Sequence, residues 1–425
     1  MSKIWYPFSQ EAIKSDKIKI VKAKNEMFFD DKGNSYIDLI SSWWTSIHGH
    51  CNDEICDIIA SQSRNLDHVI FSDFTHEMAE KLVMQIDKMT KSIFAKMFFS
   101  DNGSTSVEVA VKIAHQYWKN CGINSKNIVI SFKNGYHGDT LLAMSAGKMS
   151  GYFDNFVDLM PSFEFLDYPS TYIGDENFAQ KEENVLNNLM EIIEKNPDKI
   201  SSLIIEPLVQ GAGGMNMCRA DFLEKIVKIC NENKIIVIFD EVMTGFYRTG
   251  EYFAHTNLLK TPDIICLSKG ITGGFFPLGM TCVKSWIYDA FYSSEVDKSF
   301  LHGHSYTANP IICAAAAKSC EILQRGEIAE KILKISRIYD KILADFPSDI
   351  CEKPRICGTI FAFDIKCEGG YGSQISRQIK ESAIKSGLNI RPLGKTIYFM
   401  PPYCIDLSNL QSYIMKILSL IQNII

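Results

Sequence analysis

The chain has 425 residues, of which 46% are hydrophobic and 22% charged, and its formal net charge is -6. This length exceeds the size at which one hydrophobic core usually stops growing, so we expect one large domain and at least one smaller one. The composition excludes a disordered chain and a disulfide-stapled miniature fold. The negative charge, without a basic run among aromatic residues, argues against a nucleic-acid partner.

The cysteines and the two ends of the chain indicate the compartment. The thirteen cysteines are scattered without C-x-x-C spacing, which favours reduced thiols over disulfides or a zinc site and predicts a cytoplasmic protein. The first seven residues contain no apolar signal segment, and no stretch approaches the roughly 20 apolar residues that a membrane-spanning helix needs. Residues 410–425 instead predict a docked amphipathic helix, with a buried face of Leu410, Ile414, Ile417, Leu418 and Ile421.

The order of predicted elements gives the fold class. The first 45 or so residues contain a turn at residues 31–34 and a strand at residues 36–40, which predict a small separate layer. Later runs rich in β-branched residues alternate with helical patterns, which is typical of a mostly parallel sheet buried under helices. These runs are residues 128–132, 203–205, 235–239 and 264–267.

A helix of small residues begins after Asn309 and Pro310, and alternating helix and strand patterns continue to the end of the chain. We therefore predict an α/β fold in two parts. A large domain would comprise residues 49–309, and a smaller α/β domain would combine residues 1–48 with residues 310–425.

In mostly parallel sheets ligands bind at the carboxyl ends of the strands, so the residues after each run matter most. The run at residues 97–99 is followed by a turn rich in glycine and hydroxyl groups and then by a helix over residues 107–117. Such a turn offers N–H groups and hydroxyls to an anion, which makes Gly103 and Ser104 candidates for a phosphate cup. An ordinary serine or threonine helix cap is the alternative interpretation.

Two ionisable residues follow two further strands. Asp240 comes directly after residues 235–239, and a carboxylate there needs a cationic or hydrogen-bonding partner to stay ionised. Lys269 follows residues 264–267, where loss of hydration would lower its pKa and expose a nucleophilic amine. A structural ion pair between the two is the alternative.

A phosphate cup, an acid and a lysine at neighbouring strand ends meet the requirements of pyridoxal phosphate. The lysine would form the Schiff base, the acid would keep the pyridine nitrogen protonated, and the cup would hold the phosphate. Tyr136, after the strand at residues 128–132, is the candidate to cover the ring. Its alternative is a turn tyrosine packed on the sheet.

An ordered set of motifs across most of the chain resembles the class III aminotransferases of fold type I. The motifs are residues 100–104 (SDNGS), 133–140 (KNGYHGDT), 205–207 (IEP) with 210–211 (QG), 240–242 (DEV), 245–250 (GFYRTG), 268–270 (SKG) and 302–306 (HGHSY) with 309–310 (NP). This resemblance implies a homodimeric pyridoxal-phosphate enzyme with Lys269 as the Schiff-base lysine, Asp240 at the pyridine nitrogen and Tyr136 stacked on the ring. Ser305 falls where the family has a phosphate-binding hydroxyl from the other subunit. The implied cofactor-binding residues are Gly103, Ser104, Tyr136, Glu206, Asp240, Val242, Lys269, His304 and Ser305.

Other motifs are similar to the biotin-pathway branch of that class, which converts 8-amino-7-oxononanoate to 7,8-diaminononanoate. They are residues 5–8 (WYPF), 41–45 (SSWWT) with 47–49 (IHG), 117–118 (YW), 209–214 (VQGAGG) and 390–395 (IRPLGK) with 400–402 (MPP). This similarity implies that Arg391 pairs with a substrate carboxylate. The implied substrate-binding residues are Phe8, Trp43, Tyr136, Asp139, Arg248, Gly303 and Arg391.

Phe8 stands where the branch members that use S-adenosylmethionine typically have tyrosine, and relatives with phenylalanine there resemble versions that use lysine. We expect S-adenosylmethionine as the amino donor, with lysine as the alternative. Tyr247, where the family usually has glycine, has no explanation in the sequence.

Two rival functions stay open. The first is another class III enzyme that acts on ω-amino acids or acetylornithine, and the second is a non-catalytic nucleotide-binding α/β protein. No metal site is expected, because the histidines at positions 48, 50, 302 and 304 lack ligand spacing. His76 is expected at an exposed helix start.

Overall fold

A seven-stranded mixed sheet lies at the centre of the molecule. The computed structural model describes residues 3–10, 12, 17–147, 152–367 and 373–425. The strand order is β4-β12-β11-β10-β7-β5-β6. Strand β12 is antiparallel to both of its neighbours and the other four pairs are parallel, so the predicted mostly parallel sheet is confirmed. The strands are β4 (Lys96–Ser100), β5 (Ile128–Phe132), β6 (Glu164–Leu166), β7 (Ile200–Ile205), β10 (Ile236–Asp240), β11 (Ile264–Leu267) and β12 (Gly279–Val283).

The central strands form because both of their faces are buried under helices. In β10, Ile236 and Ile238 pack in one hydrophobic cluster with α4, whereas Val237 and Phe239 pack in another with α6 and α7. Alternate side chains of a strand point to opposite faces, so a run of apolar residues can fill both clusters. The helices around this sheet are α2 (Asp53–Asn65), α3 (Glu77–Met89), α4 (Gly103–Asn120), α5 (Leu141–Ala146), α6 (Phe178–Lys195), α7 (Ala220–Glu232), α8 (Ser285–Asp289) and α9 (Pro310–Leu323).

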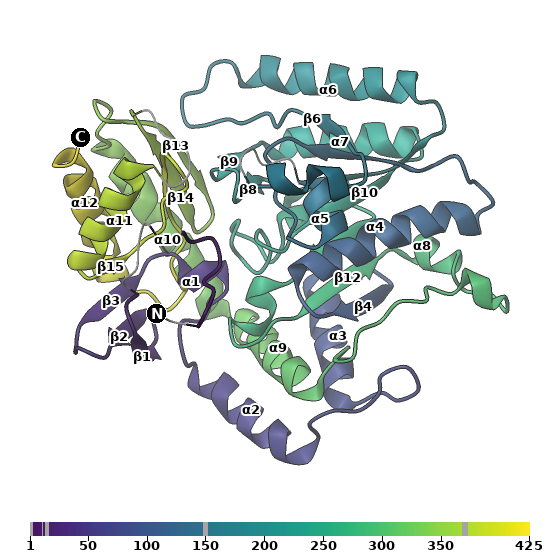
Figure 1. Ribbon diagram of the computed structural model, residues 1–425, viewed down its shortest axis with the longest axis horizontal. Helices are drawn as coiled ribbons and strands as arrows, with labels where there is room; N and C mark the ends of the chain where they lie inside the picture. Colours follow the sequence, from purple (N-terminus) through teal and green to yellow (C-terminus); the bar gives the residue numbers. More distant parts are fainter. Residues whose placement is uncertain (1–2, 11, 13–16, 148–151, 368–372) are drawn as a thin grey trace.

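Both ends of the chain contribute to a second layer, seen beside the central sheet in Figure 1. Strand β3 pairs in parallel with β15, which joins Ile37 to Leu388 and Asp38 to Asn389. The resulting sheet has the order β1-β2-β3-β15, and an antiparallel sheet β13-β14-β16 lies in the same part of the molecule. The elements are β1 (Ile20–Lys24), β2 (Met27–Asp30), β3 (Ser35–Asp38), β13 (Cys351–Cys357), β14 (Ile360–Ile365), β15 (Leu388–Asn389), β16 (Thr396–Phe399), α10 (Gly326–Ala344), α11 (Gln374–Lys385) and α12 (Leu407–Gln422).

Helix α9 packs against α2 and α3, whereas α10 packs against α12 and β13. The domain limits at residues 48 and 310 stay a prediction.

The short elements are α1 (Ser41–Trp44), β8 (Val209–Gln210), β9 (Asn216–Met217) and the 3-10 helices η1 (Asp154–Leu159), η2 (Ala254–Asn257), η3 (Lys269–Thr272) and η4 (Val296–Lys298).

The amphipathic helix predicted at the C-terminus is confirmed as α12, which buries the five predicted residues. The expectation for His76 was wrong about its exposure. This residue caps α3 as predicted, but it is buried and its Nε2 lies 2.7 Å from the carbonyl oxygen of Ala308. None of the helices in the described ranges combines the length and the apolar character needed to cross a membrane.

Candidate active site

The strand ends singled out by the sequence meet at one cavity of about 430 Å³. Because parallel strands end at the same edge of the sheet, residues far apart in the chain become neighbours there. The walls of this cavity include seven predicted site residues, namely Gly103, Ser104, Tyr136, Glu206, Asp240, Val242 and Lys269.

Lys269 begins η3, with one residue between it and the end of β11, and its backbone has a φ of 45°. This left-handed conformation costs energy for a residue with a side chain, and such strain is often kept at functional sites. Burial lowers the pKa of Lys269 below its usual value, although the charges of Asp240 and Glu206 act to raise it. The Nζ atom lies 4.8 Å from the ring centroid of Trp44. Burial therefore makes the uncharged, nucleophilic form of this amine easier to reach than it is for a lysine in water.

Asp240 ends β10 and has the hydrogen-bonding partner that its burial requires. His137 Nδ1 lies 2.7 Å from Asp240 Oδ2, and the N–H of Val242 donates to Asp240 Oδ1 at 3.0 Å. Burial alone would lower the pKa of His137, but the hydrogen bond and charge of Asp240 outweigh it and raise that pKa. The sequence reasoning missed His137, although it stands next to the predicted stacking residue Tyr136.

The predicted phosphate cup is the first turn of α4. Asn102 caps this helix in a capping box with Thr105, so both the helix-cap interpretation and an anion site at the free N–H groups are compatible with the structure. Gly103 is needed here because a Cβ atom at this position would lie 2.8 Å from Val242 Cγ1. Ser104 Oγ accepts a hydrogen bond from the N–H of Asp139 at 3.0 Å.

Tyr136 is held at both ends. Its N–H donates to Glu206 Oε2 at 3.1 Å, and its hydroxyl donates to Asp139 Oδ2 at 2.8 Å. Glu206 also accepts the N–H of Gly211 at 3.0 Å. Burial raises the pKa of Glu206 to about 7, against the lowering effect of His137. Asp139 thus orients the tyrosine ring that lines the cavity.

A second cavity of about 320 Å³ adjoins the first, because Trp44, Thr45, Tyr136 and Lys269 line both. It brings together Phe8, Trp43 and Arg391, three predicted substrate residues from distant parts of the chain. The guanidinium carbon of Arg391 lies 3.8 Å from the ring centroid of Trp43, and Phe8 meets Trp43 edge to face at 5.5 Å. Aromatic walls with one cation suit a mostly apolar ligand with a carboxylate end.

The remaining predicted residues lie elsewhere. Arg248 lines neither cavity; it is buried, and its guanidinium donates to the carbonyl oxygens of Pro401 at 3.0 Å and Trp44 at 3.4 Å. This placement gives no support to a substrate contact. Gly303, His304 and Ser305 line a separate cavity of about 560 Å³. Among the residues that the structure describes, no group of three or more histidine, cysteine, aspartate or glutamate side chains could hold a metal ion.

The first cavity fits the predicted cofactor chemically. A partly buried amine of lowered pKa lies in the same cavity as a buried carboxylate and a helix start, and these suit an aldehyde, a pyridine nitrogen and a phosphate respectively. The arrangement can form a covalent imine, stabilise a cationic ring and move a proton through Lys269.

Comparison with known proteins agrees with this chemistry. The family described as Aminotransferase class-III matches residues 9–421. A protein of Synechococcus elongatus named adenosylmethionine-8-amino-7-oxononanoate aminotransferase is 42% identical over 99% of this chain and 99% of its own length. A protein of the same name from Helicobacter pylori is 35% identical over 95% of this chain and 92% of its own length.

Solved structures of similar shape include enzymes of the same kind. The adenosylmethionine-8-amino-7-oxononanoate aminotransferase of Methanocaldococcus jannaschii superposes with a TM-score of 0.90 at 30% identity, covering 99% of this chain and 96% of its own. An amine transaminase from an uncultivated Pseudomonas species, in a PLP-bound form, gives a TM-score of 0.91 at 26% identity. The match covers 99% of this chain and 98% of that one.

Proposed function

This chain belongs to the class III aminotransferases, and from that premise we propose that it converts 8-amino-7-oxononanoate to 7,8-diaminononanoate in biotin biosynthesis. It is a pyridoxal-phosphate-dependent transaminase of fold type I. The full-length relatives that carry the name of this activity support the choice of acceptor.

The observation that carries the proposal is the pair of adjoining cavities. Lys269 lines both, and Arg391 lines the second beside Trp43. A substrate with a ketone at one end and a carboxylate at the other can therefore reach the lysine while its acid group meets a guanidinium. A planar guanidinium suits bidentate pairing with a carboxylate.

In the proposed mechanism the residues of this chain bind, orient and move a proton. When bound, pyridoxal phosphate would supply an electron sink for the donor carbon and a carrier for the amino group between two half-reactions. Lys269 Nζ would remove the proton from the donor carbon in the first half-reaction and deliver a proton to the acceptor carbon in the second, a task that suits its lowered pKa. Asp240, held by His137, supplies the buried negative charge that keeps a ring nitrogen cationic.

The amino donor is part of the proposal, with S-adenosylmethionine preferred and lysine as the alternative. Phe8 lines the second cavity without a hydroxyl, so it offers no hydrogen bond to a donor. Its ring instead packs on Trp43 and lies 6.0 Å from the Arg391 guanidinium carbon. An aromatic surface of this kind accommodates a sulfonium or ammonium group.

We further propose a homodimer with shared active sites in the cytoplasm. Gly303, His304 and Ser305 line a cavity separate from that of Lys269 in the single chain, which supports their use by a partner copy. Seven of the thirteen cysteine thiols are buried and all thirteen are free, which supports a reducing compartment.

A product assay tests the proposed function. Purified enzyme with pyridoxal phosphate receives 8-amino-7-oxononanoate and either S-adenosylmethionine or lysine, and 7,8-diaminononanoate is measured by mass spectrometry. Product with one donor and not the other identifies that donor. No product with either donor, together with turnover of ω-amino acids or acetylornithine, would replace the proposed acceptor with that of another class III enzyme.

A further inference from the structure

The segment at residues 390–395 contributes Arg391 and Leu393 to the wall of the second cavity. The residue on each side of this segment is hydrogen-bonded to a buried carboxylate. We propose that Asp38 at one end and Asp364 with Arg355 at the other are positioning residues that hold Arg391 against Trp43. They would thereby set the affinity for a carboxylate-bearing substrate. This inference deepens the proposed function and rests on it.

Asp38 fastens the first end. It ends β3, is fully buried, and its Oδ1 accepts a hydrogen bond from the side-chain amide of Asn389 at 3.1 Å. Asn389 ends β15, two residues before Arg391. The other oxygen of Asp38 accepts the N–H of Ser42 at 2.6 Å and lies 2.9 Å from His50 Nε2. One carboxylate therefore binds the segment before Arg391 and the residue before Trp43.

The turn that holds Trp43 needs such a partner because its backbone is strained. Ser42 has φ 62° and ψ -95°, and the neighbours Ser41 and Trp44 also have positive φ values, 49° and 67°. Left-handed residues with side chains cost of order 1 kcal/mol or more each. A charged acceptor on the Ser42 N–H stabilises this conformation more than a neutral one would.

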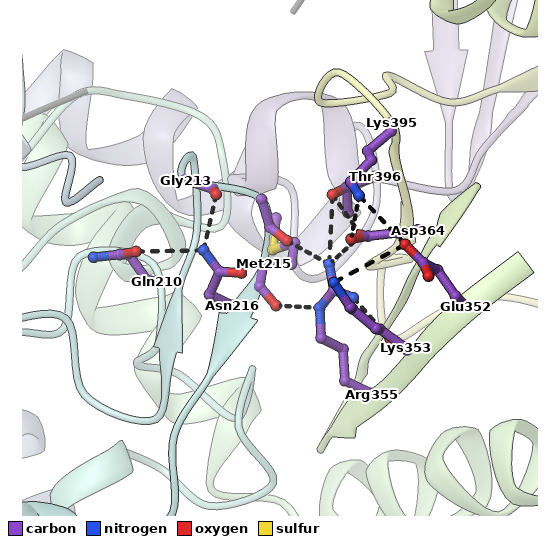
Figure 2. A network of polar contacts seen from close by, with 11 residues as sticks. Gln210, Gly213, Met215, Asn216, Glu352, Lys353, Arg355, Asp364, Lys395 and Thr396 are labelled. Atoms are coloured by element: carbon purple, nitrogen blue, oxygen red, sulfur yellow. Dashed lines mark hydrogen bonds and ion pairs between the residues drawn. The ribbon is translucent and has the colours of Figure 1, made fainter. Parts of the chain in front are cut away.

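The second end is fastened by the network in Figure 2. Thr396 Oγ1 donates to Asp364 Oδ1 at 2.9 Å, and Arg355 Nη2 donates to the same oxygen at 2.8 Å. Arg355 also donates through Nη2 to the carbonyl oxygen of Gly214 at 2.7 Å and through Nε to that of Met215 at 2.8 Å. The arginine is buried, so these partners offset the cost of removing its charge from water.

Each fastening therefore reaches a different wall of the second cavity. Asp38 reaches the turn of Trp43, and Arg355 reaches the loop between β8 and β9, which contributes Ala212 to the wall. The position of Arg391 relative to both walls is fixed by groups that do not line the cavity themselves. Asp38, Asp364 and Arg355 are thus positioning residues and not catalytic ones.

The test measures carboxylate binding apart from turnover. Holoenzymes of the wild type, Asp38→Asn and Asn389→Ala are titrated with nonanoate by calorimetry, and KM and kcat are measured for 8-amino-7-oxononanoate. We expect both variants to weaken nonanoate binding and to raise KM, with kcat nearly unchanged. For Asp38→Asn each of the two changes should be about tenfold. Asn389→Ala removes only the link to the Arg391 segment, so it answers the question even if Asp38→Asn does not fold.

Asp175→Asn is the matched control. Asp175 is also a buried carboxylate that accepts a backbone N–H, that of Asn177, but it lines neither cavity. We expect no change in nonanoate binding for this variant. Arg355→Lys, which keeps the charge but loses the forked geometry, should weaken nonanoate binding as the Asp38 variant does.

A double-mutant cycle decides whether the effect acts through Arg391. In an Arg391→Ala background, Asn389→Ala should cause no further loss of nonanoate binding. Three results would each overturn the inference. They are equal nonanoate binding by the wild type and Asn389→Ala, an additive loss of binding in the cycle, and no nonanoate binding by the wild type. The variants could also weaken nonanoate binding in an enzyme that does not turn over 8-amino-7-oxononanoate. That result would contradict the proposed function and leave the inference about Arg391 intact.

Discussion

The proposed catalytic lysine lies where its charged form is poorly solvated. Lys269 is partly buried, has a lowered pKa and has a strained φ of 45°. The Trp44 ring lies beside its amine, and Asp240 is in the same cavity. Because of these features, Lys269 is the first residue to substitute.

We predict that Lys269→Ala lowers turnover by at least about a thousandfold, because a positioned acid and base contributes up to about ten thousandfold to a rate. The variant should still fold, as measured by circular dichroism and thermal unfolding. Lys133→Ala is the control, since that exposed lysine pairs with Asp167 and lines neither active-site cavity. Turnover near the wild-type rate in Lys269→Ala would remove this lysine from the mechanism.

His137 predicts a pH dependence of stability. Asp240 raises the pKa of His137 above its ordinary value of 6.5, so the protonated pair stabilises the fold fully below that pH and less as pH rises through the raised pKa. The difference in unfolding temperature between wild type and His137→Gln should therefore be largest below pH 6.5 and shrink as the pH rises above that value.

His48 provides a control of opposite sign. Burial lowers the pKa of His48 to about 4, so its contribution to stability is present above pH 6.5 and lost as pH falls toward 4. The difference between wild type and His48→Gln should shrink at low pH. If both variants followed the same trend, the pH dependence would not come from these two side chains.

Individual residues also show what the sequence could and could not provide. Lys269, Asp240 and Gly103 follow apolar runs, and that position is visible in the sequence. His137 and Asp38 act through partners 103 and 351 positions away, so their roles depend on contacts that no local pattern contains. Tyr247 has a φ of 72°, a conformation that favours glycine, and its ring packs 4.6 Å from that of Tyr252.

At the scale of elements, the bounds of two buried strands could be predicted closely, whereas the run at residues 203–205 covers only the second half of β7. The predicted runs at residues 128–132 and 264–267 coincide with β5 and β11, because both faces of these strands are apolar. Helix α4 begins at Gly103, earlier than the predicted residue 107. The apolar periodicity starts only where the helix meets the sheet, whereas its first turn is fixed by hydrogen bonds to Asn102.

The capping box of α4 leads to a prediction about cofactor affinity. Asn102→Ala should lower the free energy of unfolding by about 1 kcal/mol. It should also weaken binding of pyridoxal phosphate, because the first turn of α4 would fray where a phosphate would bind. Urea unfolding and equilibrium dialysis measure the two effects.

Ser373→Ala is the matched control for that substitution. Ser373 caps α11 by accepting the N–H of Ser376, and it lines neither active-site cavity. It should lower stability by a similar amount and leave cofactor affinity unchanged. An equal loss of affinity in both variants would contradict a specific role for the α4 turn.

At the scale of the whole molecule, the proposed homodimer can be measured directly. Light scattering should give twice the chain mass of 48.1 kDa. Ser305→Ala should leave that mass unchanged but weaken binding of pyridoxal phosphate by about tenfold, the effect of one lost hydrogen bond to a charged group. Ser293→Ala, at an exposed serine, should change neither. A monomeric wild type with full cofactor affinity would contradict the shared site.

The pairing of β3 with β15 has a consequence for how the protein is made. The hydrogen bond between Asn389 and Asp38 joins residues 351 positions apart, so the ribosome must finish most of the chain before it can form. At roughly 5 to 20 residues per second, the strands synthesised first wait tens of seconds for their last neighbour. A nascent or prematurely terminated chain that ends before β15 already contains Lys269, the proposed catalytic amine, but lacks Arg391, the proposed partner of a substrate carboxylate. If both proposals hold, the residues for the reaction are translated early and the residue for substrate selection is translated near the end.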